Sequence, residues 1–296
     1  MENESELIKQ TATTRWTVAT AHALGRLTGS TVFYAVISAG ALLMVMPMIW
    51  MLTTSFKGEQ TVFDVPIQWI AVPLHVENYA RAYGFVAWPQ YYFNSFFVAV
   101  AQVVLNLSVC SAAGFGFAKY RFPGRTFCFL LVLSTLMIPF QVIMVPLFIV
   151  TRQLGWLNSY AGLIIPGAVG AFGVFLMRQF MVTLPDELFA AARIDGASEL
   201  RLFWGIAIPL SKPALAALAI FTFTGSWDNL LWPLIVTTKS WLFTLPLGLA
   251  GFNSEYGNDY TGLMAASTAA TIPLIILFAL LQKQFVEGIV MTGLKA

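Results

Sequence analysis

Long apolar runs constrain this chain more than any other feature. A helix needs about 20 mostly apolar residues to cross a lipid bilayer, and six runs of that kind occur, at 31–54, 93–118, 127–150, 161–180, 214–236 and 262–281. Only 10% of the 296 residues are charged, whereas about a quarter are charged in an average soluble domain. The sequence therefore predicts an all-α integral membrane protein with six transmembrane helices.

The lysines and arginines predict the orientation, because basic residues are retained on the cytoplasmic side of a membrane. If the N-terminus is cytoplasmic, the outer side holds only Lys57, Arg81, Arg152 and Lys239, and the other basic residues face the cytoplasm. Both termini are therefore predicted to be cytoplasmic.

This topology divides the chain into a cytoplasmic N-terminal segment (1–30), a first transmembrane helix (31–54), an outer loop (55–92), a five-helix core (93–284) and a cytoplasmic C-terminal tail (285–296). The first segment contains Glu2, Glu4 and Glu6 and has no cleavable pattern beside a short apolar core. It is therefore interpreted as a cytoplasmic lead-in and not as a signal peptide.

The charged cytoplasmic loop at 184–213 is where this apolar chain can bind a soluble partner. Thr183 can cap a helix whose first turn contains Pro185, Asp186 and Glu187, since an oxygen acceptor, a proline and acidic groups all suit a helix N-terminus. That helix is predicted to run to about Ile194.

A tight turn is predicted to separate this helix from a second one. Asp195-Gly196 favours a turn in which the glycine adopts a positive φ. Ser198 can cap the second helix, and Pro209 and Pro213 mark its end. The sequence therefore predicts a short helix-turn-helix at the membrane surface.

The outward face of the first helix is expected to consist of Ala190, Ala191 and Ala192, whose small side chains let a partner approach the backbone closely. The wider pattern comprises Ala191, Ala192, Asp195, Gly196, Ala197, Ser198, Phe203, Ile206, Ile208, Pro209, Leu210 and Pro213. It resembles the EAA loop of permease subunits of binding-protein-dependent ABC importers, which forms the coupling helix that docks on the ATPase. Ala190 replaces the glutamate of that pattern, and Glu187, one turn earlier, is an alternative acidic group.

Other motifs extend the resemblance to carbohydrate importers, and in particular to the smaller permease of a maltose-type pair. They are Met137-Ile138-Pro139, Leu163-Ile164-Ile165-Pro166, Phe243-Thr244-Leu245-Pro246, Met264-Ala265-Ala266 and the ending Gly293-Leu294-Lys295. The resemblance implies the type I ABC importer permease fold and the import of sugars or oligosaccharides. It also implies that the tail residues Gly293, Leu294 and Lys295 contact the ATPase.

The same resemblance implies the partners and the location of the chain. The expected partners are a second permease subunit, an ABC ATPase dimer, an extracytoplasmic solute-binding protein and membrane lipid, with no nucleic acid. The expected location is the cytoplasmic (inner) membrane of a bacterium or archaeon. No cofactor is expected on this chain, since ATP and Mg would bind to the ATPase subunits.

Four residues of the fifth apolar run are candidates for a substrate path: Trp227, Asp228, Asn229 and Trp232. Sugars stack their C–H faces on aromatic rings and exchange hydrogen bonds with carboxylate and amide groups. In the alternative, the sugar site lies wholly in the other permease and these side chains serve helix packing.

The sequence argues against two other functional classes. An ion-coupled secondary transporter needs titratable residues within its spans, and Asp228 is the only acidic residue placed deep inside one. An intramembrane enzyme needs a catalytic constellation, and none is visible; the two cysteines, Cys110 and Cys128, indicate neither a disulfide nor a metal site. No lysine follows a glycine, so the phosphate-binding loop G-x-x-x-x-G-K-[ST] is absent and the chain is predicted not to be an enzyme.

Overall fold

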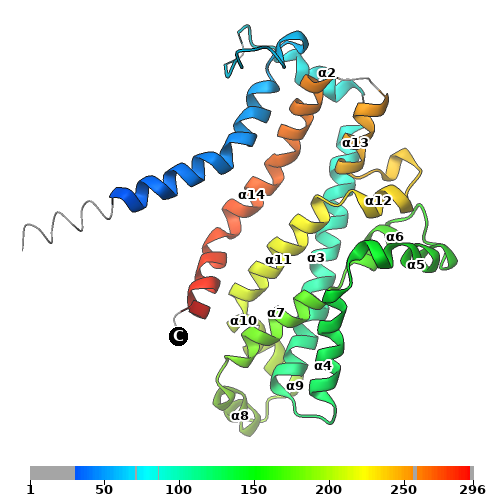
Figure 1. The fold of residues 1–296 in the computed structure, drawn as a ribbon. Coiled ribbons are helices and arrows are strands. Elements are labelled where there is room, and N and C mark those ends of the chain that lie inside the picture. The colour runs from blue at the N-terminus through cyan, green and yellow to red at the C-terminus, as the bar shows by residue number, and fades with distance from the viewer. Residues whose placement is uncertain (1–30, 71, 86, 256–258, 294–296) are drawn as a thin grey trace, which may run out of the picture.

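The computed structural model describes residues 31–70, 72–85, 87–255 and 259–293, and within them it contains helices and no β-strand. Three of these helices are long and apolar enough to cross a membrane: Thr31–Thr54, α3 (Trp88–Lys119) and the Tyr260–Gln282 part of α14 (Tyr260–Gly293). Three bent helix pairs raise that number to 6 if each pair forms one span. Figure 1 shows the long helices running between two ends of an elongated molecule.

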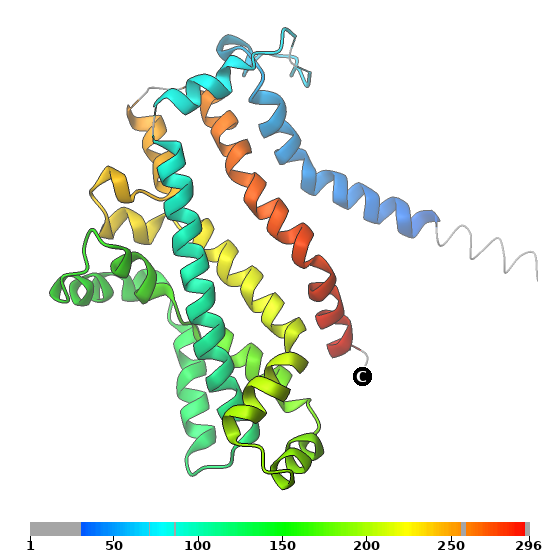
Figure 2. The ribbon, with the colours of Figure 1, turned by 180° about the vertical axis from the view of Figure 1, so that it is seen from behind.

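Helix α3 lies at the centre of the structure and packs against α7 (Ala171–Val182) and α11 (Lys212–Trp227), as both ribbon views show (Figures 1 and 2). The closest approach occurs at Gly114, where an added Cβ would lie 2.6 Å from Met177 Cβ and 2.9 Å from the Arg178 backbone nitrogen. Gly116 lies two residues further along α3 and has open space beside it. The two helix backbones therefore touch at Gly114 and not at Gly116.

The third predicted span, 127–150, is not one straight helix. Helix α4 (Arg125–Ser134) continues into the 3-10 turn η2 (Thr135–Met137), and α5 (Phe140–Gln153) follows at an angle of 102°. The break lies at Pro139, which has no N–H to continue a helix and has an extended conformation. Helix α5 continues through Pro146, so only the first of the two prolines breaks the span.

The other two bent pairs have smaller angles. Helix α6 (Tyr160–Ile164) with η3 (Ile165–Gly167) meets α7 at 46°. The segment formed by α9 (Glu199–Leu202), the π-helical η4 (Phe203–Ala207) and α10 (Ile208–Leu210) meets α11 at 77°, across the single residue Ser211. The π-helical turn precedes Pro209, where the missing N–H disturbs the regular hydrogen-bond pattern.

The fifth predicted span, 214–236, is also interrupted. Helix α11 ends at Trp227, and α12 (Leu231–Val236) is a separate helix. Asp228 is the C-terminal cap of α11, and its side chain is exposed. The expectation that Asp228 lies in the middle of a continuous helix is therefore wrong, because the polar pair Asp228-Asn229 occupies the break.

The outer loop contributes η1 (Glu59–Thr61) and α2 (Glu77–Phe85), and the later outer segment contributes η5 (Ser240–Leu242) and α13 (Leu245–Glu255). Arg81 on α2 ties this loop to the start of α14, because its Nε lies 2.9 Å from Asp259 Oδ2 and its Nη2 donates to Thr261 Oγ1 at 2.8 Å. Helix α8 (Asp186–Ile194) lies at the opposite end of the molecule from α2 (Figure 1).

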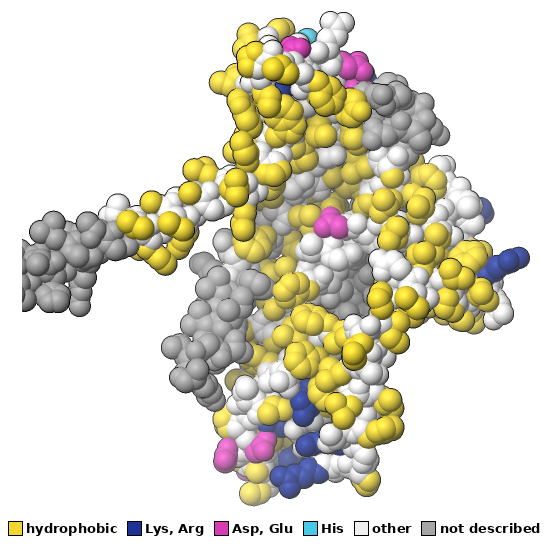
Figure 3. Space-filling view, in the orientation of Figure 1, with side chains coloured by type: hydrophobic (Ala, Val, Ile, Leu, Met, Phe, Trp, Pro, Cys, Tyr) yellow, Lys and Arg dark blue, Asp and Glu magenta, His cyan; other side chains and the backbone are white. Residues whose placement is uncertain are grey.

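Charged side chains gather at the end that carries α8 and α9, and the middle of the visible face is largely apolar (Figure 3). An apolar cluster supports that end from within and includes Phe115, Met181, Phe189, Leu202 and Phe203. By contrast, the most apolar window of the Thr31–Thr54 helix is 0% buried within this chain. The core that positions the loop is therefore built from α3, α7 and the segments that follow.

Candidate functional site

The loop at 184–213 forms the predicted helix-turn-helix. Helix α8 begins at Asp186 with Pro185 as its N-cap, and Asp186 and Glu187 occupy the first turn. The expected cap at Thr183 is wrong, because Thr183 ends α7 and its Oγ1 donates to the Phe180 carbonyl at 2.7 Å. Lys119, at the end of α3, holds the start of the loop instead by donating to the Leu184 carbonyl and to Asp186 Oδ1, both at 2.6 Å.

The turn between the two helices follows the chemistry expected from its sequence. Helix α8 ends at Ile194, and Gly196 has a φ of 81°. Its N–H donates to the Arg193 carbonyl at 3.0 Å, and the Ala197 N–H donates to the Ala192 carbonyl at 2.9 Å, which is the Schellman pattern that closes a helix C-terminus. Ser198 Oγ then accepts from the Arg201 N–H at 3.4 Å and caps α9.

An ion pair fixes the angle between α8 and α9. Arg193 donates from Nε to Glu199 Oε1 at 2.8 Å and from Nη2 to Glu199 Oε2 at 3.0 Å, which is a bidentate geometry. Tyr120, at the end of α3, also donates to Glu199 Oε2. The hydrogen bonds from Arg193 and then Tyr120 lower the pKa of Glu199 from 4.5 to about 2. The loop therefore has a defined shape before any partner binds.

We expect acidification from pH 8 to pH 5 to leave the loop intact. The Glu199 pKa is depressed, so its stabilising contribution is present above the ordinary value of 4.5 and is lost only as the pH falls toward about 2. Amide hydrogen exchange at residues 196–202 should be equally protected at pH 8 and pH 5 after correction for intrinsic rates. Arg193→Gln should lower that protection at both pH values, and protection that titrates near pH 6 would contradict this assignment.

The outward face of the loop differs in part from the expectation. Ala190 and Ala191 are exposed, whereas Ala192 is half-buried and packs on the apolar cluster beneath α8. Leu188, Ile194 and Leu200 are exposed as well, with Ile194 at 87% and Leu200 at 73%. The exposed face of the loop therefore combines small residues with protruding apolar side chains that sequence reasoning missed. Their signal was the apolar residues Ile194 and Leu200 on either side of the turn in an otherwise polar stretch.

The remaining residues of this predicted site are Glu187, Asp195, Ala197 and Pro209. Glu187, Asp195 and Pro209 are exposed, and Ala197 is half-buried against the same cluster as Ala192. In the predicted tail contact, Gly293 is the last residue of α14. Leu294 and Lys295 lie outside the described residues.

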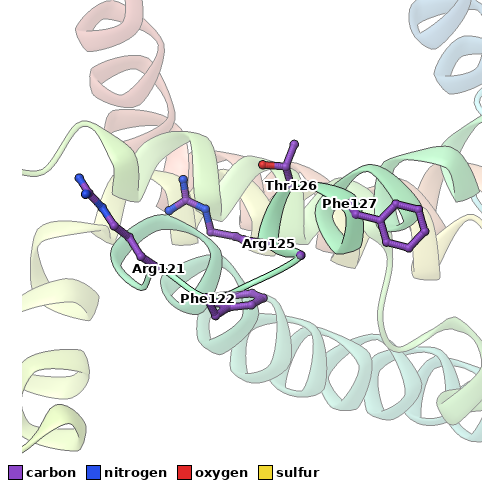
Figure 4. Close-up of a pocket in the computed structure, with 6 residues that line it drawn as sticks. Arg121, Phe122, Arg125, Thr126 and Phe127 are labelled. Carbon is purple, nitrogen blue, oxygen red and sulfur yellow. The ribbon is translucent and has the colours of Figure 1, made fainter.

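A basic turn lies beside the loop, between α3 and α4. In Figure 4 the Arg121 and Arg125 side chains extend to the same side of this turn, and Phe127 points away from them. Arg125 Nη1 donates to the Tyr120 carbonyl at 3.0 Å, which fixes the turn. The exposed side chains Phe122 and Phe127 flank the arginines, a combination that suits the boundary between membrane and water.

The four residues predicted for a substrate path do not form one surface. Trp227 and Trp232 are 3% and 2% exposed, and their Nε1 atoms donate to the Ala270 carbonyl at 3.2 Å and the Gly162 carbonyl at 2.8 Å. Both indoles thus pack between helices. Asp228 and Asn229 lie at the break after α11, and Asn229 lines a cavity.

This cavity has a volume of about 240 Å³ and lies between α3, α7 and α11. Its lining residues are Gln102, Asn106, Gly167, Gly170, Phe172, Gly173, Leu218, Phe221, Thr222, Gly225, Ser226 and Asn229. Sequence reasoning missed all of them except Asn229. A signal was present, because Gln102 and Asn106, like Thr222 and Ser226, are polar residues four positions apart on one face of an apolar helix.

Within the part of the chain that the structure describes, no group of three or more His, Cys, Asp and Glu side chains could hold a metal ion. Cys110 is buried and Cys128 is exposed. The apolar helices define a multi-pass membrane protein with a charged helix-turn-helix at one end.

Comparisons with known proteins agree with this class. The family model described as "Binding-protein-dependent transport system inner membrane component" matches residues 110–290, and the chain belongs to this family. The arabinooligosaccharides transport system permease protein of Bacillus subtilis is 38% identical over 90% of this chain and 94% of its own length. The counterpart in Halalkalibacterium halodurans is 45% identical over 68% of this chain and 72% of its own length.

A related permease with a different named substrate is also similar. The sn-glycerol-3-phosphate transport system permease protein of Yersinia enterocolitica is 36% identical over 85% of this chain and 92% of its own length. Among solved structures, a bacterial ABC transporter involved in the import of the acidic polysaccharide alginate has a chain with a TM-score of 0.76. That chain is 25% identical, and the match covers 88% of this chain and 97% of that one. The chain is thus a permease subunit of an ABC importer and not an ATP-hydrolysing enzyme.

Proposed function

We propose that this chain is the smaller permease of an ATP-driven importer of sugars or oligosaccharides, working with a second permease, an ABC ATPase dimer and an extracytoplasmic solute-binding protein. The observation that carries the proposal is the preformed docking surface of α8 and α9, held by Lys119 and by the Arg193–Glu199 ion pair. Its exposed residues Ala190, Ala191 and Ile194 present a small-residue, apolar face to a cleft on an ATPase. ATP and Mg bind to that partner in this proposal.

The proposed topology places six spans in the cytoplasmic (inner) membrane, with both termini and α8 on the cytoplasmic side. The positive-inside distribution of basic residues supports this orientation, and so does the position of α8 at the opposite end of the molecule from the outer loop (Figure 1). The three spans formed by bent pairs are then α4 with α5, α6 with α7, and α11, and the Glu199–Leu210 arm that precedes α11 stays on the cytoplasmic side with α8. Broken helices at membrane depth are tolerated where they line a cavity or are buried in protein, which suits a translocation path.

The carbohydrate assignment rests on the relatives and on the sequence motifs. Two relatives are named as arabinooligosaccharide permeases and another as a lactose permease. In coupling, closure of the ATPase dimer moves the docked α8, and the permease pair changes the side to which its path opens. The C-terminal residues Gly293, Leu294 and Lys295 are proposed to contact the ATPase as well.

Reconstitution of the purified subunits tests this proposal. This chain alone should hydrolyse no ATP, because it has no phosphate-binding loop. It should co-purify with the second permease and two ATPase copies, and the sugar-loaded binding protein should stimulate hydrolysis by that complex. Uptake into vesicles supplied with ATP should persist when the proton gradient is collapsed. Uptake that disappears with the gradient, despite ATP, would replace the proposal by the ion-coupled transporter.

A further inference from the structure

We infer that the cavity between α3, α7 and α11 is a binding site for a neutral, hydroxyl-rich substrate, so that this permease contacts the carbohydrate itself. The inference rests on the proposed function and deepens it, because it assigns a substrate class and a place. The cavity of about 240 Å³ has roughly the volume of eight waters in the liquid, at about 30 Å³ each, so it has room for a sugar ring.

The floor of the cavity is polar and buried. Gln102 and Asn106 are each 6% exposed, although both belong to an apolar helix. Gln102 Nε2 donates to the Leu163 carbonyl at 3.0 Å, which fixes that amide. Asn106 Oδ1 and Ser226 Oγ are buried without a hydrogen-bond partner. Such atoms cost free energy unless a ligand or water satisfies them. A sugar hydroxyl can donate to Asn106 Oδ1, and it can donate to or accept from the Ser226 hydroxyl.

The cavity floor is held rigidly by the helix packing around it. A methyl group at Gly173 would lie 2.7 Å from Asn106 Oδ1 and 2.7 Å from Cys110 Sγ, so α7 can approach α3 at this level only with a glycine there. Cys110 Sγ donates to the Gly170 carbonyl at 3.6 Å on the same helix pair. The Asn106 amide is therefore fixed against Gly173, near the N-terminal end of α7.

The rim of the cavity is aromatic and exposed. Phe172 and Phe221 are 42% and 50% exposed, and their rings meet edge to face with centroids 5.6 Å apart. The edges and faces of such rings pack against the C–H faces of sugars. A pyranose or furanose has polar hydroxyl groups and apolar C–H faces. The polar floor suits the hydroxyl groups, and the aromatic rim suits the C–H faces.

The lack of charged lining residues indicates which class of substrate the cavity can bind. All twelve lining residues belong to the described part of the chain, and none carries a charge. The charged group next to it in sequence is Asp228, an exposed carboxylate between the lining residues Ser226 and Asn229. A phosphate or uronate would find no cation in this lining. The geometry therefore favours a neutral carbohydrate over glycerol phosphate or an acidic polysaccharide.

Thiol protection in the reconstituted complex tests the inference directly. Cys128→Ser removes the exposed native thiol, and Ser226→Cys then places a reactive thiol in the cavity wall. Arabinotriose or lactose, whichever stimulates ATP hydrolysis more, should slow the reaction of this thiol with a small methanethiosulfonate reagent at least about fivefold when the binding protein is left out. The same concentrations of sn-glycerol 3-phosphate and an alginate trisaccharide should leave the rate unchanged. Ser240→Cys, an exposed serine of the outer segment, is the matched labelling control.

Uptake measurements provide a second readout. Ser226→Ala should lower ATP-driven uptake of the same sugar about two- to tenfold, the effect of losing one hydrogen bond. Ser108→Ala should leave uptake unchanged, because Ser108 lies on the same helix as Asn106 and its Oγ donates to the Val104 carbonyl outside the cavity.

The outcomes separate this inference from the proposed function. If no sugar stimulates ATP hydrolysis by the complex, the carbohydrate importer itself is wrong. If a sugar stimulates hydrolysis but neither slows labelling of Ser226→Cys nor loses uptake in Ser226→Ala, the importer stands and the site in this chain is wrong. Protection by glycerol phosphate or by the alginate trisaccharide would overturn the neutral substrate class.

Discussion

Gly196→Val should weaken the binding of the ATPase to this permease, and the variant should still insert into the membrane. Gly196 has a φ of 81°, and a β-branched residue there costs roughly 1–2 kcal/mol or rearranges the turn. An added Cβ meets nothing within 4 Å, so the effect comes from the backbone alone. Rearrangement would break the hydrogen bonds that close α8 and would shift Arg193 away from Glu199. We expect normal membrane levels of the variant, about five- to thirtyfold less co-purifying ATPase and little uptake.

Two controls belong with this experiment. Gly196→Asn should keep most of the attachment, because asparagine tolerates the left-handed conformation better than valine. Gly205→Val tests an added side chain in the same loop, at a glycine that also has open space but no positive φ. If Gly196→Val binds the ATPase as well as the wild type does, α8 is not the coupling element.

Gly114→Val should prevent α3 and α7 from packing. The added Cβ would lie 2.6 Å from Met177 Cβ and 2.9 Å from the Arg178 backbone nitrogen, and neither atom can yield without moving the helix. Overpacking of a core typically costs 1–3 kcal/mol and occasionally more, and here the obstacle is partly backbone. We expect the variant to be degraded or to aggregate on extraction, measured as the monodisperse fraction in size-exclusion chromatography and as the midpoint of thermal unfolding.

Gly116→Val is the matched control, since it makes the same change on the same helix where an added Cβ meets nothing within 4 Å. It should be extracted and unfold as the wild type does. Equal behaviour of the two variants, whether both stable or both unstable, would contradict the assigned contact between α3 and α7.

Local chemistry made the loop predictable. The positive φ of Gly196, the Ser198 cap and the end of α8 at Ile194 each follow from two or three neighbouring residues, and the structure confirms all three. The Thr183 cap failed because Pro185 already starts α8 and Thr183 still belongs to the end of α7. Where one helix ends only a few residues before the next begins, the same residue can cap either helix, and the sequence does not show which one it caps.

Features that depend on packing were beyond the sequence. Gly114 and Gly116 look alike in an apolar run, yet only the first faces another backbone. The buried positions of Trp227 and Trp232 depend on partner helices far away in sequence. The break at Pro139 was foreseeable from proline, but its 102° angle was not, because a missing hydrogen bond permits a bend without setting its size. The cavity forms only where α3, α7 and α11 meet. For the same reason, the sequence pointed to just one of its lining residues, Asn229.

The 77° junction at Ser211 makes the chain on either side of it a bent lever with two helical arms. One arm, Glu199–Leu210, begins at the turn after α8, and the other, α11, carries Ser226 on the cavity wall. The pivot is compact, because the Ser211 N–H donates to the Ala207 carbonyl at 3.0 Å and its carbonyl accepts from the Leu215 N–H at 2.9 Å. With 16 residues, the α11 arm is about 24 Å long, so a rotation of about 5° about the pivot would displace its far end by about 2 Å. In the proposed topology, a small tilt of the Glu199–Leu210 arm would therefore move the wall of the cavity sideways, at nearly a right angle to the arm.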